Sequence, residues 1–210
     1  MKINCKNRLE SLKINLLSKA IALMAKRKFV FLLLILLISS CLKDRTFPLP
    51  VSPPTGTLVI NEFMATETLD YGDEFGTGAG SDWIEIYNGT DTTVTMGANQ
   101  WYMSDTIGQP NKYLMPATVN GHSLTIASKN YLVVYCDGLD STKTQIHTSF
   151  KLSHTSGDVV LYYKPTVGAA HIVDSYTYGL QVKDITWGRL PNGGSNWTQC
   201  TKPTPGYVNQ

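Results

Sequence analysis

Residues 82–89 read DWIEIYNG and contain the residue types of an acidic active site. Asp82 and Glu85 could act as a general acid and a general base, and the aromatic side chains beside them could stack on a sugar ring. Side chains alternate between the two faces of a β-strand, so two carboxylates three residues apart leave opposite faces. If the stretch is a strand, Asp82 and Glu85 therefore do not converge on one substrate bond. The predicted strand places Trp83, Glu85 and Tyr87 on one face and Ile84 and Ile86 on the other.

The loop at residues 69–83 is the second place where side chains could do chemistry. It holds four carboxylates among four glycines: Asp70, Asp73, Glu74 and Asp82. Hard oxygen ligands on a flexible loop suit calcium, although the spacing differs from that of the 12-residue EF-hand loop. Acidic clusters are also commonly solvated without an ion. Calcium at this loop stays an alternative to a solvated loop, and no other cofactor is expected.

The remaining chemistry-bearing residues form no recognisable catalytic or zinc motif. The four histidines are His122, His147, His154 and His171. None is paired at two- or four-residue spacing and no CxxC accompanies them, so no zinc site is expected. The chain also lacks the GxSxG elbow of serine hydrolases. We therefore assign no catalytic residue and predict that the protein is not an enzyme, with a hydrolase built from distant residues as an alternative.

The elements that must position these residues are strands. From residue 57 onward, short segments rich in valine, isoleucine and tyrosine are separated by turns with glycine or asparagine, and no window shows a helical apolar period. Asn88-Gly89 predicts one such turn, with positive φ angles. This pattern is typical of an all-β sandwich or barrel, and we predict one domain at residues 57–210.

The N-terminal part predicts a targeting segment. Residues 29–38 read FVFLLLILLI, an apolar run too short to span a membrane, which follows three basic residues and precedes Ser39-Ser40-Cys41. This arrangement resembles the signal peptide of bacterial lipoproteins, in which the cysteine carries the lipid. We predict a signal peptide at residues 1–40, whose true start could be Met24, and lipidation of Cys41.

Residues 41–56 contain four prolines and predict a semi-rigid tether between the lipid and the domain. Leu42 follows the lipidated cysteine. By resemblance to lipoproteins, the lack of an acidic residue there favours the outer membrane, and the leaflet is left open.

The charge of the mature chain argues against nucleic-acid binding. Residues 1–40 hold eight of the 18 basic residues and one of the 16 acidic ones, so the remainder has 10 basic and 15 acidic residues, a net charge near −5. Affinity for a phosphate backbone rests on clustered lysine and arginine, which this part lacks.

Taken in order, the segments resemble the bacterial lamin tail domain. The matching segments are LVINEFMA (58–65), SDWIEIYN (81–88), NQWYMSD (99–105), YLVVYCDG (131–138), TSFKLSHTSGDVVLYY (148–163), IVDSYTYG (172–179), TWGRLPNGGSNW (186–197) and TPGYVN (204–209). The resemblance implies an immunoglobulin-like β-sandwich with an accessory role and implies no reaction. No coiled-coil rod and no attached nuclease accompanies it.

Two cysteines remain in the domain once Cys41 is acylated and Cys5 is removed. Cys136 and Cys200 would lie in an oxidising compartment, which favours a disulfide. A bridge needs Cα atoms within about 7 Å, and a buried cysteine also serves as a small apolar residue. We predict two free thiols.

The leading interpretation is a lipid-anchored, extracytoplasmic module that binds another molecule, an envelope protein above all, and catalyses nothing. Sheet edges make strand addition a natural mode of binding. A carbohydrate-binding accessory module for a surface glycan is the alternative. It would use the four tryptophans, Trp83, Trp101, Trp187 and Trp197, as an exposed platform.

Overall fold

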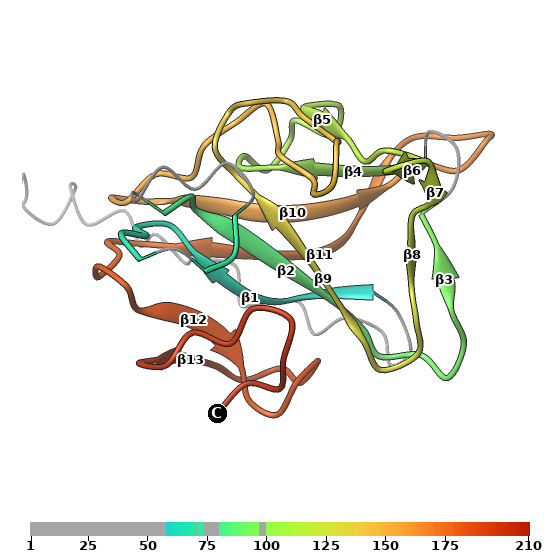
Figure 1. Cartoon of the computed structure of the whole chain (residues 1–210). Coiled ribbons are helices and arrows are strands. Elements are labelled where there is room, and N and C mark those ends of the chain that lie inside the picture. Colours follow the sequence, from blue (N-terminus) through green and yellow to red (C-terminus); the bar gives the residue numbers. More distant parts are fainter. Residues whose placement is uncertain (1–57, 70, 74–79, 97–99) are drawn as a thin grey trace, which may run out of the picture. The chain divides into compact units, whose positions relative to one another are not determined.

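The computed structural model describes residues 58–69, 71–73, 80–96 and 100–210 (Figure 1). All of them belong to one compact unit, Phe47–Gln210. The predicted signal peptide, Cys41 and the tether lie outside the described residues, as do Asp70 and Glu74. The described residues form strands and turns without a helix, and so they contain no helix that could cross a membrane.

The larger sheet has five antiparallel strands in the order β13–β12–β1–β2–β9. These strands are β1 (Leu58–Met64), β2 (Trp83–Asn88), β9 (Tyr131–Tyr135), β12 (Thr186–Arg189) and β13 (Trp197–Cys200). Figure 1 shows the last two, in red, beside β1 near the C-terminus. The sequence therefore builds this sheet from segments at both ends of the domain.

The smaller sheet has four strands in the order β11–β10–β4–β5. They are β4 (Trp101–Ser104), β5 (Tyr113–Leu114), β10 (Gly157–Tyr163) and β11 (His171–Tyr178). Two short ribbons complete the described strands: β3 (Val94–Thr95) pairs with β8 (Thr125–Ile126), and β6 (Thr118–Val119) pairs with β7 (His122–Ser123). The two main sheets pack as an all-β sandwich, as the alternating pattern predicted.

The apolar side chains of both sheets form one core. Ile84 and Ile86 from β2 are fully buried, and they join Met103 from β4 and Val159 and Leu161 from β10 in the same cluster. Full burial of one such side chain contributes about 1.5–3 kcal/mol. The prediction that the two isoleucines share the core face of their strand is confirmed.

The opposite face of β2 is buried as well. Trp83 and Glu85 are both 0% exposed, and Trp83 packs with Met64 and Tyr135 in a second cluster. An alternating strand with polar residues on one face is usually solvated on that face. Here residues after β13 cover it, because the backbone N–H of Gly206 donates to Glu85 Oε2 at 2.6 Å.

The turn predicted at Asn88-Gly89 is built differently. Neither residue has a positive φ. Asn88 is buried, and its side-chain amide donates to the carbonyls of Thr92, Ile126 and Ala127 at 2.8–3.1 Å, while its Oδ1 accepts from the backbone N–H of Thr90 at 3.0 Å. The asparagine side chain shapes this turn, so that positive φ angles are not needed.

A buried ion pair connects the two sheets at a bulge in β1. Arg189 Nη2, on β12, donates to both carboxylate oxygens of Asp174 on β11, at 2.8 and 2.9 Å. The Asp174 carboxylate accepts from the backbone N–H of Ile60, and Arg189 Nε donates to the Ile60 carbonyl at 2.7 Å. The pairing register of β1 and β2 shifts between Ile60 and Glu62. The ion pair therefore supplies side-chain partners to strand backbone at an irregular position.

Candidate functional site

Glu85, one of the two acids of DWIEIYNG, belongs to a buried polar network. Glu62 of β1 and Glu85 of β2 are direct cross-strand neighbours. Asn61 Nδ2 donates to Glu85 Oε1 at 2.8 Å, and Thr204 Oγ1 donates to Glu62 Oε2 at 2.8 Å. Asn209 Nδ2 donates to the carbonyls of Asn61 and Arg189 at 3.2 and 3.0 Å. The network fastens the C-terminal residues to the larger sheet.

Burial perturbs both carboxyl groups of this network. It raises the pKa of Glu85 from 4.5 to about 8, against the lowering effect of the hydrogen bonds from Asn61 and Gly206. Burial also raises the pKa of Glu62. Opposed carboxyls with raised pKa values can act as an acid–base pair when substrate reaches them. Both are 0% exposed and accept hydrogen bonds from this chain, so their role here is structural.

Asp82, the other acid of DWIEIYNG, lies apart from Glu85 as predicted. It precedes β2, and its Oδ1 accepts from the backbone N–H of Glu67 at 3.4 Å. Burial raises the pKa of Asp82 to about 6. Its carbonyl accepts from the backbone N–H of Cys136 at 2.6 Å. Asp82 thus holds the loop after β1 to the end of β9.

The predicted calcium loop contributes one residue to a cluster that the sequence did not indicate. Asp73 lies with Asp137 and His147, and one ligand atom from each falls within 4.8 Å of the others. Asp82 is not in this group, and Asp70 and Glu74 lie outside the described residues. No spacing signal could have found the cluster, because His147 follows Asp73 by 74 positions in the sequence.

The other three histidines lie elsewhere. His122 is an exposed residue of β7, and His154 is exposed after β9 and before β10. His171 begins β11 and lines a cavity with Tyr163, whose ring centroid lies 5.7 Å from its own. The described histidines are therefore not gathered in one site.

The tryptophans form no exposed platform. Trp83 is fully buried, and the other three are half-buried. Trp197 stacks on Tyr176 with a centroid distance of 4.3 Å, and the guanidinium of Arg189 lies 4.6 Å from the Trp197 ring centroid. Trp101 is the tryptophan that lines the cavity.

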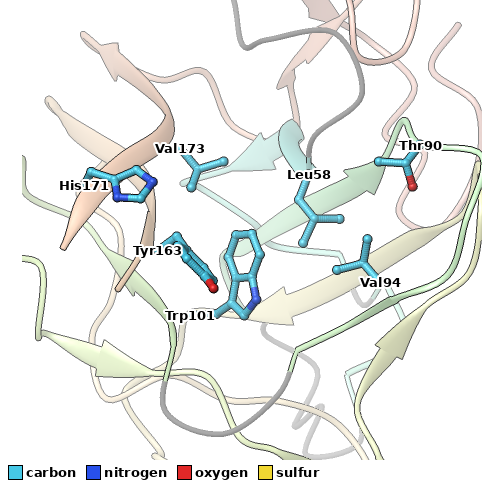
Figure 2. Close-up of a pocket in the computed structure, with 7 residues that line it drawn as sticks. All are labelled: Leu58, Thr90, Val94, Trp101, Tyr163, His171 and Val173. Carbon is cyan, nitrogen blue, oxygen red and sulfur yellow. The ribbon is translucent and has the colours of Figure 1, made fainter. Parts of the chain in front are cut away.

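The cavity has a volume of about 380 Å³ and is open to solvent on one side. Both sheets contribute to its lining, which is mainly apolar: Leu58, Thr90, Val94, Trp101, Tyr163, His171 and Val173. Figure 2 shows Trp101 and Tyr163 between His171 and Val173 on one side and Leu58, Val94 and Thr90 on the other. Trp101 and Tyr163 meet edge to face with centroids 5.0 Å apart. An aromatic cavity with few polar groups suits an apolar side chain or a small ring.

The edge strands of the two main sheets differ in length and in how their backbone is covered. The C-terminal end of β9 is covered, because the backbone N–H of Tyr135 donates to the Ile146 carbonyl and that of Thr148 donates to the Tyr135 carbonyl, both at 2.8 Å. β11 is the longest edge strand among the described residues, and its backbone pairs with β10. Its residues His171 and Val173 also line the cavity. The longest strand edge and the cavity are therefore neighbours.

The two cysteines lie near opposite edges of the larger sheet. Cys136 follows β9 and Cys200 ends β13, and both are buried with free thiols. Four strand spacings of about 4.8 Å separate these edges, on the order of 19 Å. That separation is well beyond the reach of a disulfide.

Comparison with known proteins identifies one family. The family model described as Lamin Tail Domain matches residues 51–180, which end just after β11. The β12–β13 hairpin and the C-terminal residues that bind Glu62 and Glu85 follow the matched region. No curated protein and no solved structure matches the chain.

Proposed function

This chain belongs to the lamin tail domain family, and on that premise we propose that it is a lipid-anchored, extracytoplasmic module that binds a protein of the cell envelope and catalyses no reaction. The family has an immunoglobulin-like, non-enzymatic fold, which makes the domain a structural or binding module. The envelope-protein partner and the lipid anchor go beyond what family membership implies, and they are our proposal.

The observation that carries the proposal is the open aromatic cavity. The cavity of about 380 Å³ is lined mainly by apolar and aromatic side chains. Binding is favoured when a partner's side chain displaces water from these surfaces. Aromatic anchors of this kind dominate the energetics of protein interfaces. The partner is thus expected to insert an apolar side chain into this cavity.

The edge of β11 supports a protein partner in particular. An extended segment that pairs with an edge strand gains backbone hydrogen bonds, while neighbouring pockets select its side chains. β11 has eight residues, and its first residues line the cavity. A single extended segment could use both features, which a small soluble ligand could not.

The sequence supports the anchoring part of the proposal. Cys41 follows an apolar run and two serines, and the four prolines within residues 41–56 favour an extended tether. At about 3.1 Å per residue, an extended tether would hold the domain up to roughly 45 Å from the lipid. We propose attachment to the outer membrane, with the leaflet left open.

Capture from native membranes tests the proposal. Full-length protein should retain one envelope protein, identified by mass spectrometry, and should lose it in the variants Tyr163→Ala and Val94→Phe, which respectively remove an anchor and fill the cavity. Tyr207→Ala is the matched control, because Tyr207 is 74% exposed and does not line the cavity. Equal capture by wild type and both cavity variants would contradict the proposal.

A surface glycan is the second candidate, favoured by the Trp101–Tyr163 pair in the cavity. Sugar rings stack on aromatic faces, and this pair offers one such wall. Binding of isolated surface polysaccharide that is lost in Trp101→Ala, without capture of any protein, would select this alternative.

A further inference from the structure

The proline-rich segment at residues 47–54, which precedes β1, has the composition of a ligand as well as that of a spacer. It reads FPLPVSPP, in which Ser52 is the single polar residue and no residue is charged. Chain that stays in water is typically poor in apolar residues. The segment lies outside the described residues. Its apolar side chains would be stabilised by burial against another surface.

The prolines of this segment have the spacing of a polyproline II ligand. Pro50 and Pro53 form a PxxP sequence. A polyproline II helix has three residues per turn, so these two prolines share one edge, and Phe47 falls on the same edge one turn earlier. Such segments dock in aromatic-lined grooves and lose little entropy, because the helix is preformed. The sequence of the segment therefore suits a partly exposed aromatic surface.

The domain offers such a surface at the start of β1. Leu58 lines the open cavity of about 380 Å³, and it is the first described residue after the segment. Trp101 and Tyr163 meet edge to face in the cavity, and both are half-buried, as are Val94 and Val173 (Figure 2). Among the described residues, no lysine, arginine, aspartate or glutamate lines the cavity. The cavity therefore suits an uncharged apolar segment.

The link between the segment and the cavity is short. Four residue steps join Pro54 to Leu58, and at about 3.1 Å per step they span roughly 12 Å when extended. Gly56 lies in this link and tolerates the positive φ angles that turn a chain back. A short link gives a tethered ligand an effective concentration in the millimolar range. Even a weak affinity of the segment for the cavity is therefore sufficient for occupancy.

The family match supports a segment that is part of the domain. The match begins at residue 51, seven residues before β1, and so it includes Pro53 and Pro54. A stretch that only connects the domain to an anchor would precede the first matched residue. The position of this boundary favours contact between the segment and the domain.

From the sequence of the segment, the lining of the cavity and the short link, we propose that residues 47–54 dock in the cavity of their own chain. The edge that carries Pro50 and Pro53 lies against Trp101 and Tyr163. The ligand class of the cavity is thus a proline-rich extended segment, and the chain supplies the first such ligand itself.

Docking of the segment regulates access to the cavity. An envelope protein that binds there has to displace residues 47–54. Displacement also lengthens the free spacer from residues 42–46, roughly 15 Å when extended, to roughly 45 Å. This regulation rests on the function proposed above, whereas docking of the segment does not.

Nuclear Overhauser effects in full-length protein in detergent test docking without any partner. They should join the methyl groups of Val94 and Val173 to ring protons of Pro50 or Pro53. Val94→Phe fills the cavity and should remove the effects at Val173, whereas Tyr207→Ala, outside the cavity, should leave them unchanged. Wild-type protein without proline contacts at either valine would overturn the proposal. Contacts that arise between two differently labelled chains instead of within one chain would overturn it as well.

Capture from native membranes tests displacement. If the segment is docked in about nine chains of ten, its release should strengthen partner binding about tenfold. The double variant Pro50→Ser/Pro53→Ser should therefore capture the envelope protein at about tenfold lower concentration than wild type. The matched control Lys43→Ser/Asp44→Ser changes charged residues of the same tether and should behave as wild type. Equal or weaker capture by the proline variant would refute displacement.

The two measurements separate the two proposals. Proline contacts at the valines, together with no captured protein in any variant, would support docking and contradict the binding function. Capture that depends on the cavity, without proline contacts in the free protein, would support the binding function and contradict docking.

Discussion

Glu62 and Glu85 lie directly opposite each other on β1 and β2, and neither side chain is exposed to solvent. Like charges opposite each other across a pair of strands destabilise a sheet. The protein tolerates this pair because burial favours the protonated form and because residues near the C-terminus donate hydrogen bonds to both groups. Glu85, one of the two acids of DWIEIYNG, therefore has a structural role in the interior of the domain.

The stability of the domain should decrease as the pH rises from about 5 to about 8. The folded-state pKa of Glu85, about 8, lies above its ordinary value of 4.5, so the folded chain binds this proton more tightly than the unfolded chain does. The corresponding stabilisation is complete below the ordinary pKa and is lost as the pH passes through the folded value. Glu62, whose pKa is also raised, acts in the same direction.

Urea unfolding of wild type and Glu85→Gln at several pH values measures this effect. The variant should show a shallower fall, by up to about 1.4 kcal/mol per pH unit. Glutamine keeps one acceptor oxygen, so the baseline stability also changes and the comparison is between slopes. Asp91→Asn alters an exposed carboxylate and should keep the wild-type slope. Equal slopes for wild type and Glu85→Gln would show that Glu85 does not titrate in this range.

Removal of the inter-sheet guanidinium should be costly. Arg189→Leu leaves the Asp174 carboxylate buried without its cation and takes a donor from the Ile60 carbonyl. Breaking a buried ion pair in this way costs about 3–5 kcal/mol. Asp91→Asn breaks the exposed pair with Lys129 and should cost less than about 1 kcal/mol. Similar losses of unfolding free energy in the two variants would refute the structural role given to Arg189.

The mature protein should begin at Cys41 with acyl chains attached. The prediction rests on the apolar run at residues 29–38 and the serines before the cysteine. Intact mass of protein extracted from membranes is the measurement, and Cys41→Ala should leave the protein unacylated and misprocessed. A membrane-extracted protein that still contains residues 1–40 would show that no lipoprotein processing occurs.

Denatured, unreduced mature protein should show two reactive thiols. Cys136 and Cys200 lie near opposite edges of the larger sheet, too far apart for a bridge within one chain. Burial raises the pKa of both thiols, so they should react slowly while the protein is folded. A thiol-reactive dye counts them, and a count of zero would establish a disulfide.

The sequence could predict what depends on neighbours along the chain. The alternation in residues 83–87 placed Ile84 and Ile86 in the core, and the ordered segments indicated an immunoglobulin-like sandwich. Burial of Glu85 could not be read in this way, because Gly206, which covers it, is 121 positions away. The position of Asp73 beside His147 could not be read either, because 74 positions separate the two residues in the sequence.

The cavity could not be predicted from the sequence for the same reason, because its residues are far apart along the chain. Trp101, Tyr163 and His171 come from three different strands, and each alone reads as an ordinary aromatic residue of a sheet. Their meeting depends on the order of β4, β10 and β11 in the smaller sheet, which no local pattern specifies. A site assembled by pairing of distant strands becomes visible when the register is known.

Site-specific photo-crosslinking from the cavity tests the central claim, that the domain binds an envelope protein there, most directly. A benzophenone side chain in place of His171 should form an adduct with one envelope protein in living cells. The same side chain at Tyr207, exposed and outside the cavity, should not form that adduct. No protein adduct from position 171, or the same adduct from both positions, would contradict the account.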